Sequence, residues 1–142
     1  MFLTKECEYG IRIIRALADG SQKTVKTIAA EELIPVKFAH NIVTKLERAE
    51  FLKGIRGRSG GVRLRRPLNA FTMVDIITAI DNNRCIGECL SEDSGCVFKS
   101  HPERPCTIHN ELMWAQNVVM SALGSKTMDR VLYQDEDIRL HA

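Results

Sequence analysis

The sequence predicts a mainly α-helical fold with one short β-hairpin, a cysteine-rich loop and a long C-terminal helix. Three observations lead to this expectation. Five segments are typical of helices, two short β-compatible runs flank one glycine-rich turn, and four of the five cysteines lie between residues 85 and 106. The hydrophobic content of the 142-residue chain, 44%, is ordinary for a globular protein with a core of its own.

The first two helices are expected in the first 35 residues. Apolar side chains recur at helical spacing over residues 4–19, and Gly20 follows as a stop signal. Cys7 lies on that apolar stripe, which predicts a core cysteine rather than a ligand. A second, short helix is expected to begin after Thr24, whose hydroxyl suits an N-cap, and to end before Pro35.

The third helix, expected over residues 36–51, carries an unusually basic face. Its predicted buried stripe consists of Phe38, Ile42, Val43, Leu46 and Ala49. The opposite face is rich in hydrogen-bond donors: Lys37, His40, Asn41, Thr44, Lys45 and Arg48. Solvated helix faces usually mix acidic and basic residues more evenly, so this face indicates a polyanionic partner.

A β-hairpin is expected next, from the stretch FLKGIRGRSGGVRLRRP. Its strands are expected at 51–56 and 62–65, because the glycines of GRSGG supply the positive φ of a tight turn. Residues 53–66 include six basic and no acidic side chains. A phosphate-binding nucleotide loop is a weaker interpretation of these glycines, since no Lys-Ser/Thr follows them.

Two further helices are expected in the second half of the chain. One covers residues 72–80 and opens with a capping-box-like pair, Thr72 and Asp75. The other covers residues 107–123 and is apolar over much of its circumference, including Trp114, which predicts that it packs against a second subunit. No apolar run is long enough to span a membrane, and the last eight residues are expected to form a frayed tail.

The order helix, helix, basic helix, glycine-turn hairpin is that of a winged helix-turn-helix. We therefore expect a DNA-binding domain over residues 1–66, followed by a second unit over residues 67–142. Charge supports this division, since residues 1–70 carry a net charge of +7 and residues 71–142 a net charge of −5. The third helix suits the major groove, and arginines at the hairpin tip suit the minor groove. The predicted DNA-contacting residues are Lys37, Phe38, His40, Asn41, Lys45, Arg56, Arg58 and Arg63. A winged helix that binds another protein is the alternative from a different class.

The cysteine-rich loop needs something other than apolar burial to order it. The sequence shows no signal peptide, and thiols stay reduced in the cytosol, so a disulfide framework is disfavoured. Cys106 precedes the long helix, where the helix dipole favours thiolate, and His109 follows three residues later on the same face. An iron–sulfur cluster, a zinc ion or a thiol redox switch would each explain these residues.

Three stretches together resemble the IscR/NsrR/RirA family of bacterial winged-helix regulators: LTKECEYGIRII, IRGRSGGVRL and the cysteine-rich loop. The resemblance implies a cytoplasmic, homodimeric transcriptional regulator rather than an enzyme. It also implies an iron–sulfur cluster that senses iron, redox state or nitric oxide.

The same resemblance implies the cluster ligands. The matching trio is Cys89, Cys96 and Cys106, with either His109 or a partner-donated Glu8 as a fourth ligand. Cys85, four residues before Cys89, is a third candidate for the fourth ligand or a spare thiol. The trio is separated by six and nine residues, which is wider than is typical of the family. A 4Fe–4S cluster is expected over 2Fe–2S, with zinc as the alternative. A solvated His109 and a Glu8 paired with a neighbouring arginine are the ordinary alternatives for these two side chains.

Overall fold

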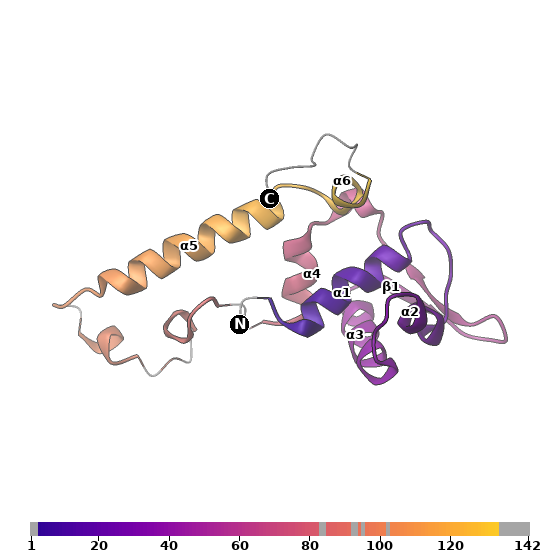
Figure 1. Ribbon diagram of the computed structural model, residues 1–142, viewed down its shortest axis with the longest axis horizontal. Coiled ribbons are helices and arrows are strands. Elements are labelled where there is room, and N and C mark those ends of the chain that lie inside the picture. The colour runs from indigo at the N-terminus through magenta and orange to yellow at the C-terminus, as the bar shows by residue number, and fades with distance from the viewer. Residues whose placement is uncertain (1–2, 83–84, 92–93, 95, 102, 134–142) are drawn as a thin grey trace.

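The computed structural model describes residues 3–82, 85–91, 94, 96–101 and 103–133. Figure 1 shows a helical body from which a long helix projects as an arm. The elements in chain order are α1 (Lys5–Ala16), α2 (Val25–Glu31), α3 (Val36–Arg48), β1 (Leu52–Ile55), β2 (Gly61–Leu64), η1 (Leu68–Ala70), α4 (Met73–Ile80), η2 (Glu88–Leu90), η3 (Val97–Ser100), α5 (Thr107–Gly124) and α6 (Met128–Leu132). We call α1–α4, the hairpin and α6 the body, and the described residues from 85 to 124 the arm. The predicted fold class is confirmed.

Helices α1 to α4 begin within one residue of the predicted positions, but α1 and α3 end three residues earlier than expected, at Ala16 and Arg48. Thr24 Oγ1 accepts a hydrogen bond of 3.1 Å from the amide of Thr27 at the start of α2. The α4 helix opens with a full capping box, in which the amide of Thr72 donates to Asp75 Oδ2 at 2.7 Å. Each such cap satisfies a backbone group that has no partner within its helix.

The core of the body lies where α1, α3 and α4 meet. Its fully buried side chains include Cys7, Ile13, Ile14, Leu17, Ile42, Leu46, Ile76 and Ile77. Burial of each large aliphatic side chain contributes about 1.5–3 kcal/mol. Phe51 and Phe71 pack edge to face, with ring centroids 5.0 Å apart, and the amide of Met128 donates to the carbonyl of Phe71 at 2.9 Å. The short helix α6, which follows α5 in the chain, therefore packs on the body. The division into units at residue 66 stays a prediction.

Phe38 departs from the expected buried stripe of α3. Its side chain is 45% exposed and lies edge-on to Tyr9, with ring centroids 6.2 Å apart. Ala39 is fully buried instead, together with Ile42, Val43 and Leu46. At 3.6 residues per turn, residue 38 stands about 100° from residue 39, so it falls on the flank of α3 that faces α1. The prediction of a buried Phe38 was wrong.

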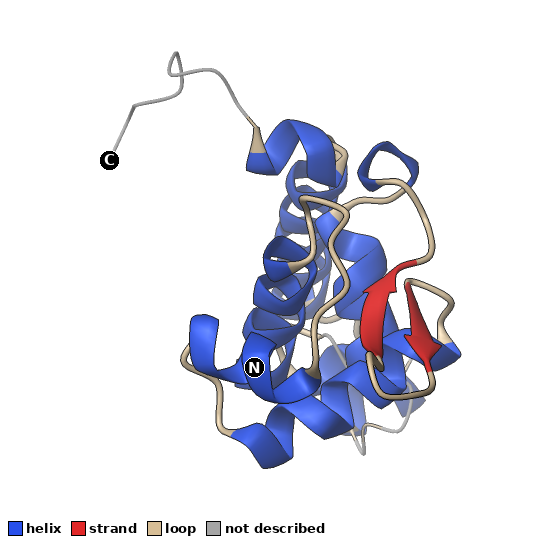
Figure 2. Ribbon diagram, turned by 90° about the vertical axis from the view of Figure 1, so that its right-hand side faces the viewer, coloured by secondary structure: helices blue, strands red, loops and turns tan. Residues whose placement is uncertain are grey.

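The hairpin is held to the body by a short bridge to the segment between α1 and α2. Leu52 and Leu64 pair at the base of the hairpin. Val62 of β2 forms two backbone hydrogen bonds with Lys23: the Lys23 amide donates to the Val62 carbonyl at 3.0 Å, and the Val62 amide donates to the Lys23 carbonyl at 2.8 Å. Gly61 has φ of 155°, and a Cβ there would come 2.5 Å from Lys23 O, so this close approach requires glycine. Figure 2 shows the two strands in red beside the helices of the body.

The arm is much less buried than the body. The α5 helix, which is described throughout, has no buried residue, and Ile108 and Trp114 are 68% and 61% exposed. Its inner side contacts α4 and η2, and the amide of Ile86 donates to Gln116 Oε1 at 3.0 Å. Within the described part of the chain, no helix is both long and apolar enough to cross a membrane.

Candidate nucleic-acid interface and cysteine segment

The exposed face of α3 carries polar and basic side chains along its whole length. Lys37, Asn41, Thr44 and Arg48 are all exposed and follow one another at helical spacing, opposite the buried stripe. Lys37 and Asn41 were predicted as DNA-contacting residues, whereas Thr44 and Arg48 were recognised as part of the polar face but not selected. Their spacing to Lys37 was the signal that could have identified them.

A groove of about 460 Å³ separates α3 from the hairpin. His40 and Thr44 line it on the α3 side, and Arg56 lines it on the hairpin side. Glu47 lies against Gly54, where a Cβ would come 2.5 Å from Oε1, so glycine lets the hairpin approach α3 closely. The predicted residues His40 and Arg56 therefore face one concave surface.

The tip of the hairpin presents the predicted arginines to solvent. Arg56 and Arg58 are exposed, and the side-chain amide of Gln22 donates to the carbonyl of Ser59. This contact and the Lys23–Val62 bridge restrict the direction in which the tip can point. A rigid, cationic tip suits insertion into a narrow minor groove.

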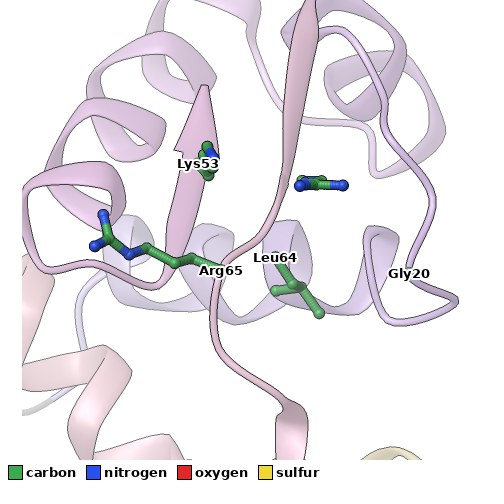
Figure 3. Close-up of a pocket in the computed structure, with 5 residues that line it drawn as sticks. Gly20, Lys53, Leu64 and Arg65 are labelled. Atoms are coloured by element: carbon green, nitrogen blue, oxygen red, sulfur yellow. The ribbon is translucent and has the colours of Figure 1, made fainter. Parts of the chain in front are cut away.

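The outer face of the hairpin carries a second basic surface. Arg63 stands directly opposite Lys53 in the strand register, and both line a pocket of about 420 Å³ with Gly20, Leu64 and Arg65 (Figure 3). Like charges placed opposite each other destabilise a hairpin. Among the described residues, neither Lys53 nor Arg63 forms an ion pair, whereas Arg65 pairs with Glu50 at 3.2 Å. An anion at this face, such as a DNA phosphate, would relieve the repulsion.

Lys45 occupies a different place from the other predicted DNA-contacting residues. Its ammonium group donates to Glu6 Oε2 at 2.6 Å and to the carbonyl of Ile80 at 3.1 Å. Lys45 therefore lies on the flank of α3 that faces α1 and α4, as Phe38 does. The structure does not bring Lys45 or Phe38 to the outer face with Lys37 and Asn41.

A buried carboxylate fixes the end of α2 against α1. Glu32 is 8% exposed; Arg15 Nε donates to its Oε1 at 3.2 Å, and Arg12 Nε lies 3.5 Å from Oε2. The hydrogen bond from Arg15, against the opposing effect of burial, holds the pKa of Glu32 below its usual value. This cluster sets the position of α2, and thereby of the turn that leads into α3.

The cysteines of the arm are free thiols on an irregular segment. Cys85, Cys89, Cys96 and Cys106 are each partly exposed, whereas Cys7 is fully buried as predicted. Cys89 lies in η2, where its carbonyl accepts a hydrogen bond from the Ser94 hydroxyl at 3.2 Å.

Two of the cysteines border helical turns. Cys96 precedes η3, and Cys106 stands at the N-cap of α5, where backbone amides have no partner within the helix.

The predicted ligand set is not assembled in the described residues. Within 3–82, 85–91, 94, 96–101 and 103–133, no three His, Cys, Asp or Glu side chains are grouped closely enough to hold a metal ion. His109 lies partly exposed in the first turn of α5, and Glu8 accepts from Lys5 Nζ at 2.7 Å rather than from an arginine. The donor chemistry nevertheless fits an iron–sulfur cluster, since three accessible thiols lie on a segment without regular packing. The ligand set stays a prediction.

The family to which the chain belongs follows from its similarity to known proteins. The family model Rrf2, described as an iron-dependent transcriptional regulator, matches residues 3–134. This chain is a member of the Rrf2 family. It is therefore a winged-helix, DNA-binding transcriptional regulator and not an enzyme, as the sequence predicts.

Relatives of this Rrf2 protein include the regulator NsrR of Oceanobacillus iheyensis, 23% identical over 97% of this chain and 94% of that protein. Among solved structures, the oxidised form of Staphylococcus aureus CymR has a TM-score of 0.74 at 20% identity, covering 96% of this chain and 99% of CymR. T. potens IscR has a TM-score of 0.73 at 19% identity, covering 98% of this chain and 91% of IscR. These two likenesses show a shared fold.

Proposed function

We propose that this Rrf2-family regulator is a homodimer whose affinity for operator DNA depends on an iron–sulfur cluster bound by cysteines of the arm. The observation that carries the proposal is the placement of three free, partly exposed thiols, Cys89, Cys96 and Cys106, on one weakly packed segment beside α5. The family description as iron-dependent supports it. A regulator of this kind acts where the DNA is, so we place it in the cytoplasm.

The DNA-contacting surface is the outer face of α3 together with the hairpin. Lys37 and Asn41 near the N-terminal end of α3 would reach base edges in the major groove, with Thr44 and Arg48 farther along the same face. The hairpin tip, with Arg56 and Arg58, would enter the adjacent minor groove. Lys53 and Arg63 would contact phosphates, which position the protein without reading the sequence.

The homodimer is supported by the exposed apolar face of α5. Trp114, Val118 and Val119 of α5 are 61%, 48% and 38% exposed. A helix with such a face buries it against another surface, and a two-fold symmetric pairing of α5 helices is the simplest arrangement.

The ligands that would hold the cluster are Cys89, Cys96 and Cys106, with His109 or Glu8 of the partner subunit as the fourth. A cluster of this kind, 4Fe–4S by preference, supplies a centre that is altered or lost when iron or redox conditions change. Because the ligands lie on a segment with little packing of its own, binding would order that segment, and cluster loss would release it.

The experiment is an anaerobic purification followed by an absorption spectrum and assays for iron, sulfide and zinc. We expect a brown protein with nearly equal iron and sulfide, and loss of both in Cys89→Ser, Cys96→Ser and Cys106→Ser. Cys7→Ala serves as the matched control, because the Cys7 side chain is fully buried in the body. A colourless protein that also fails to take up iron and sulfide on reconstitution would overturn the proposal.

A thiol-redox or zinc-stabilised regulator is the second candidate. The free thiols of the arm and the structural likeness to the oxidised form of CymR favour the redox version. A colourless protein with one zinc per chain would assign the cysteines a structural role. A metal-free protein whose arm cysteines form a disulfide on mild oxidation, with a change in operator affinity, would establish the redox switch.

A further inference from the structure

The chain from residue 81 to residue 106, which we call the cysteine segment, begins directly after Ile80, the last residue of α4. Two other helices, α1 and α3, hold Ile80 in position. The side chain of Ile80 is 6% exposed and lies against Gly10 of α1, where an added Cβ would overlap Ile80 Cδ1. Such a Cβ would also lie 3.6 Å from Ile42 Cγ2, so α1, α3 and α4 meet at this point. A displacement of Ile80 therefore has to displace its neighbours, because closely packed interiors transmit strain.

Lys45 joins Ile80 directly to α3. Its ammonium group lies 3.1 Å from the carbonyl oxygen of Ile80, at the C-terminal end of α4, and 2.6 Å from Glu6 Oε2. A cation suits this position because the last carbonyls of a helix lack partners within the helix and carry partial negative charge. Lys45 is one helical turn beyond Asn41, which lies on the outer, DNA-facing side of α3.

We propose that Lys45 is the positioning residue through which the state of the cysteine segment reaches the DNA-contacting helix. When the segment changes its direction after residue 80, the Ile80 carbonyl moves and Lys45 carries that movement to α3. DNA bound to α3 acts on the segment by the same contact in reverse, since coupling between two sites is reciprocal. The inference rests on the proposed function in that the segment is taken to have two states.

The first test compares operator affinity with and without the bound group in several variants. For the wild type we expect a ratio within the range of about 5- to 150-fold that is common for coupled sites. Lys45→Met keeps the aliphatic stem but loses both polar contacts, and its ratio should fall to within about twofold of one. Lys45→Arg, which can still donate to the carbonyl, should retain most of the wild-type ratio.

The charge-exchanged double variant Glu6→Lys with Lys45→Glu separates the two contacts of Lys45. It restores an ion pair between α1 and α3, but a carboxylate cannot donate to the Ile80 carbonyl. The proposal predicts that this variant behaves as Lys45→Met. A double variant with the wild-type ratio would overturn it, and so would a Lys45→Met protein that keeps the ratio. Lys126→Met, outside the meeting point of the three helices, is the matched control and should leave the ratio unchanged.

The second test needs no bound group, so it distinguishes failure of this inference from failure of the proposed function. Amide hydrogen exchange of residues 76–91 is measured in the metal-free protein with and without operator DNA. In the wild type, DNA should alter the exchange of this region, which includes the Asp81 amide that donates to Ile77 O at 2.9 Å. In Lys45→Met the alteration should vanish at equal occupancy of DNA. An unchanged exchange pattern in the wild type, or an equal change in both proteins, would refute the role of Lys45.

Discussion

The body and the arm are built on opposite principles although they belong to one chain. In the body, α1, α3 and α4 enclose a core of fully buried aliphatic side chains, and Phe51 and Phe71 complete it. In the arm, α5 has no buried residue, and Leu90 of η2, at 9% exposure, is the buried side chain in the described part of the cysteine segment. The body is stabilised by its own packing. The arm leaves its apolar surface exposed, and burial of that surface against a partner would stabilise it.

This difference teaches where a signal can act. A well-packed region resists small perturbations, because most of its contacts would be lost together. A region with few buried contacts changes its conformation at low cost, so a ligand bound there, or a partner subunit, can decide its state. The candidate DNA-contacting surface belongs to the body, and the candidate sensing residues belong to the arm.

Two matched phenylalanine substitutions test the contrast in packing between the body and the arm most directly. Phe71→Ala, in the body, removes a ring that is 2% exposed and should lower the free energy of unfolding by about 3–5 kcal/mol. Phe98→Ala, in the arm, removes a ring that is 52% exposed and should cost less than about 1 kcal/mol. Urea denaturation at one protein concentration measures both, and equal losses would contradict the contrast.

A carboxylate on the exposed face of α5 tests what covers the arm. Trp114→Glu should raise the dimer dissociation constant at least about 30-fold, because an unpaired charge in an interface commonly costs 2–5 kcal/mol. Asn117→Glu, a neighbouring exposed polar position, serves as the control and should have a smaller effect. Sedimentation velocity gives the association state. A Trp114→Glu protein that remains as dimeric as the wild type would show that this face is not the interface.

The ion pairs of Glu32 predict a pH dependence that is specific to the body. Its pKa is lowered in the folded state, chiefly by the hydrogen bond from Arg15, so its contribution to stability is complete above the ordinary value of 4.5. This contribution is lost as the pH falls through the lowered pKa. Glu32→Gln should therefore lower the free energy of unfolding by about 1–2 kcal/mol at pH 7. This figure is kept small because the Arg15 side chain is half exposed, so that solvent screens the pair. The loss should shrink towards zero in acid.

Thermal or chemical denaturation of wild type and Glu32→Gln across pH 3–7 measures this difference. Glu111→Gln, on the exposed surface of α5, is the matched control in the arm and should show no comparable dependence. A constant difference between wild type and Glu32→Gln over the whole range would contradict the assignment.

The basic residues on the outer face of the hairpin predict the smallest effect, a change in how DNA affinity depends on salt concentration. Each lost phosphate contact lowers the slope of log affinity against log salt by about 0.9, so Lys53→Gln with Arg63→Gln should lower it by about two. The same double variant should be no less stable than wild type, because it removes two like charges that stand opposite each other. Arg104→Gln in the arm should leave the slope unchanged. An unaltered slope in the hairpin variant would exclude these phosphate contacts.

Local patterns in the sequence predict α1 to α4, the hairpin and the long helix α5, but not the short helix α6 or the arrangement of the cysteines. The helix caps at Thr24 and Thr72, the buried Cys7 and the paired strands all follow from neighbouring residues. The flanks of α3 do not, because which side faces α1 depends on how the helices cross. For that reason Phe38 was wrongly expected to be buried, and the contacts of Lys45 with α1 and α4 were not foreseen, while its DNA contact stays a prediction.

Long-range contacts were the other limit of the sequence. The fully buried Met128 docks on Phe71 from beyond α5, and no periodicity in the short α6 segment reveals this. The proposed ligand set would depend on a bound group or a partner subunit, so neither the spacing of the cysteines nor a single chain fixes it. The predicted frayed tail, residues 135–142, lies outside the described residues.

The central claim is that the group bound by the cysteine segment controls the affinity of the body for operator DNA. The most direct test is to measure operator affinity twice on one anaerobically purified sample, before and after removal of the bound group with a chelator, at the same salt concentration. The account predicts affinities that differ by at least about fivefold. Equal affinities in the two states would contradict it.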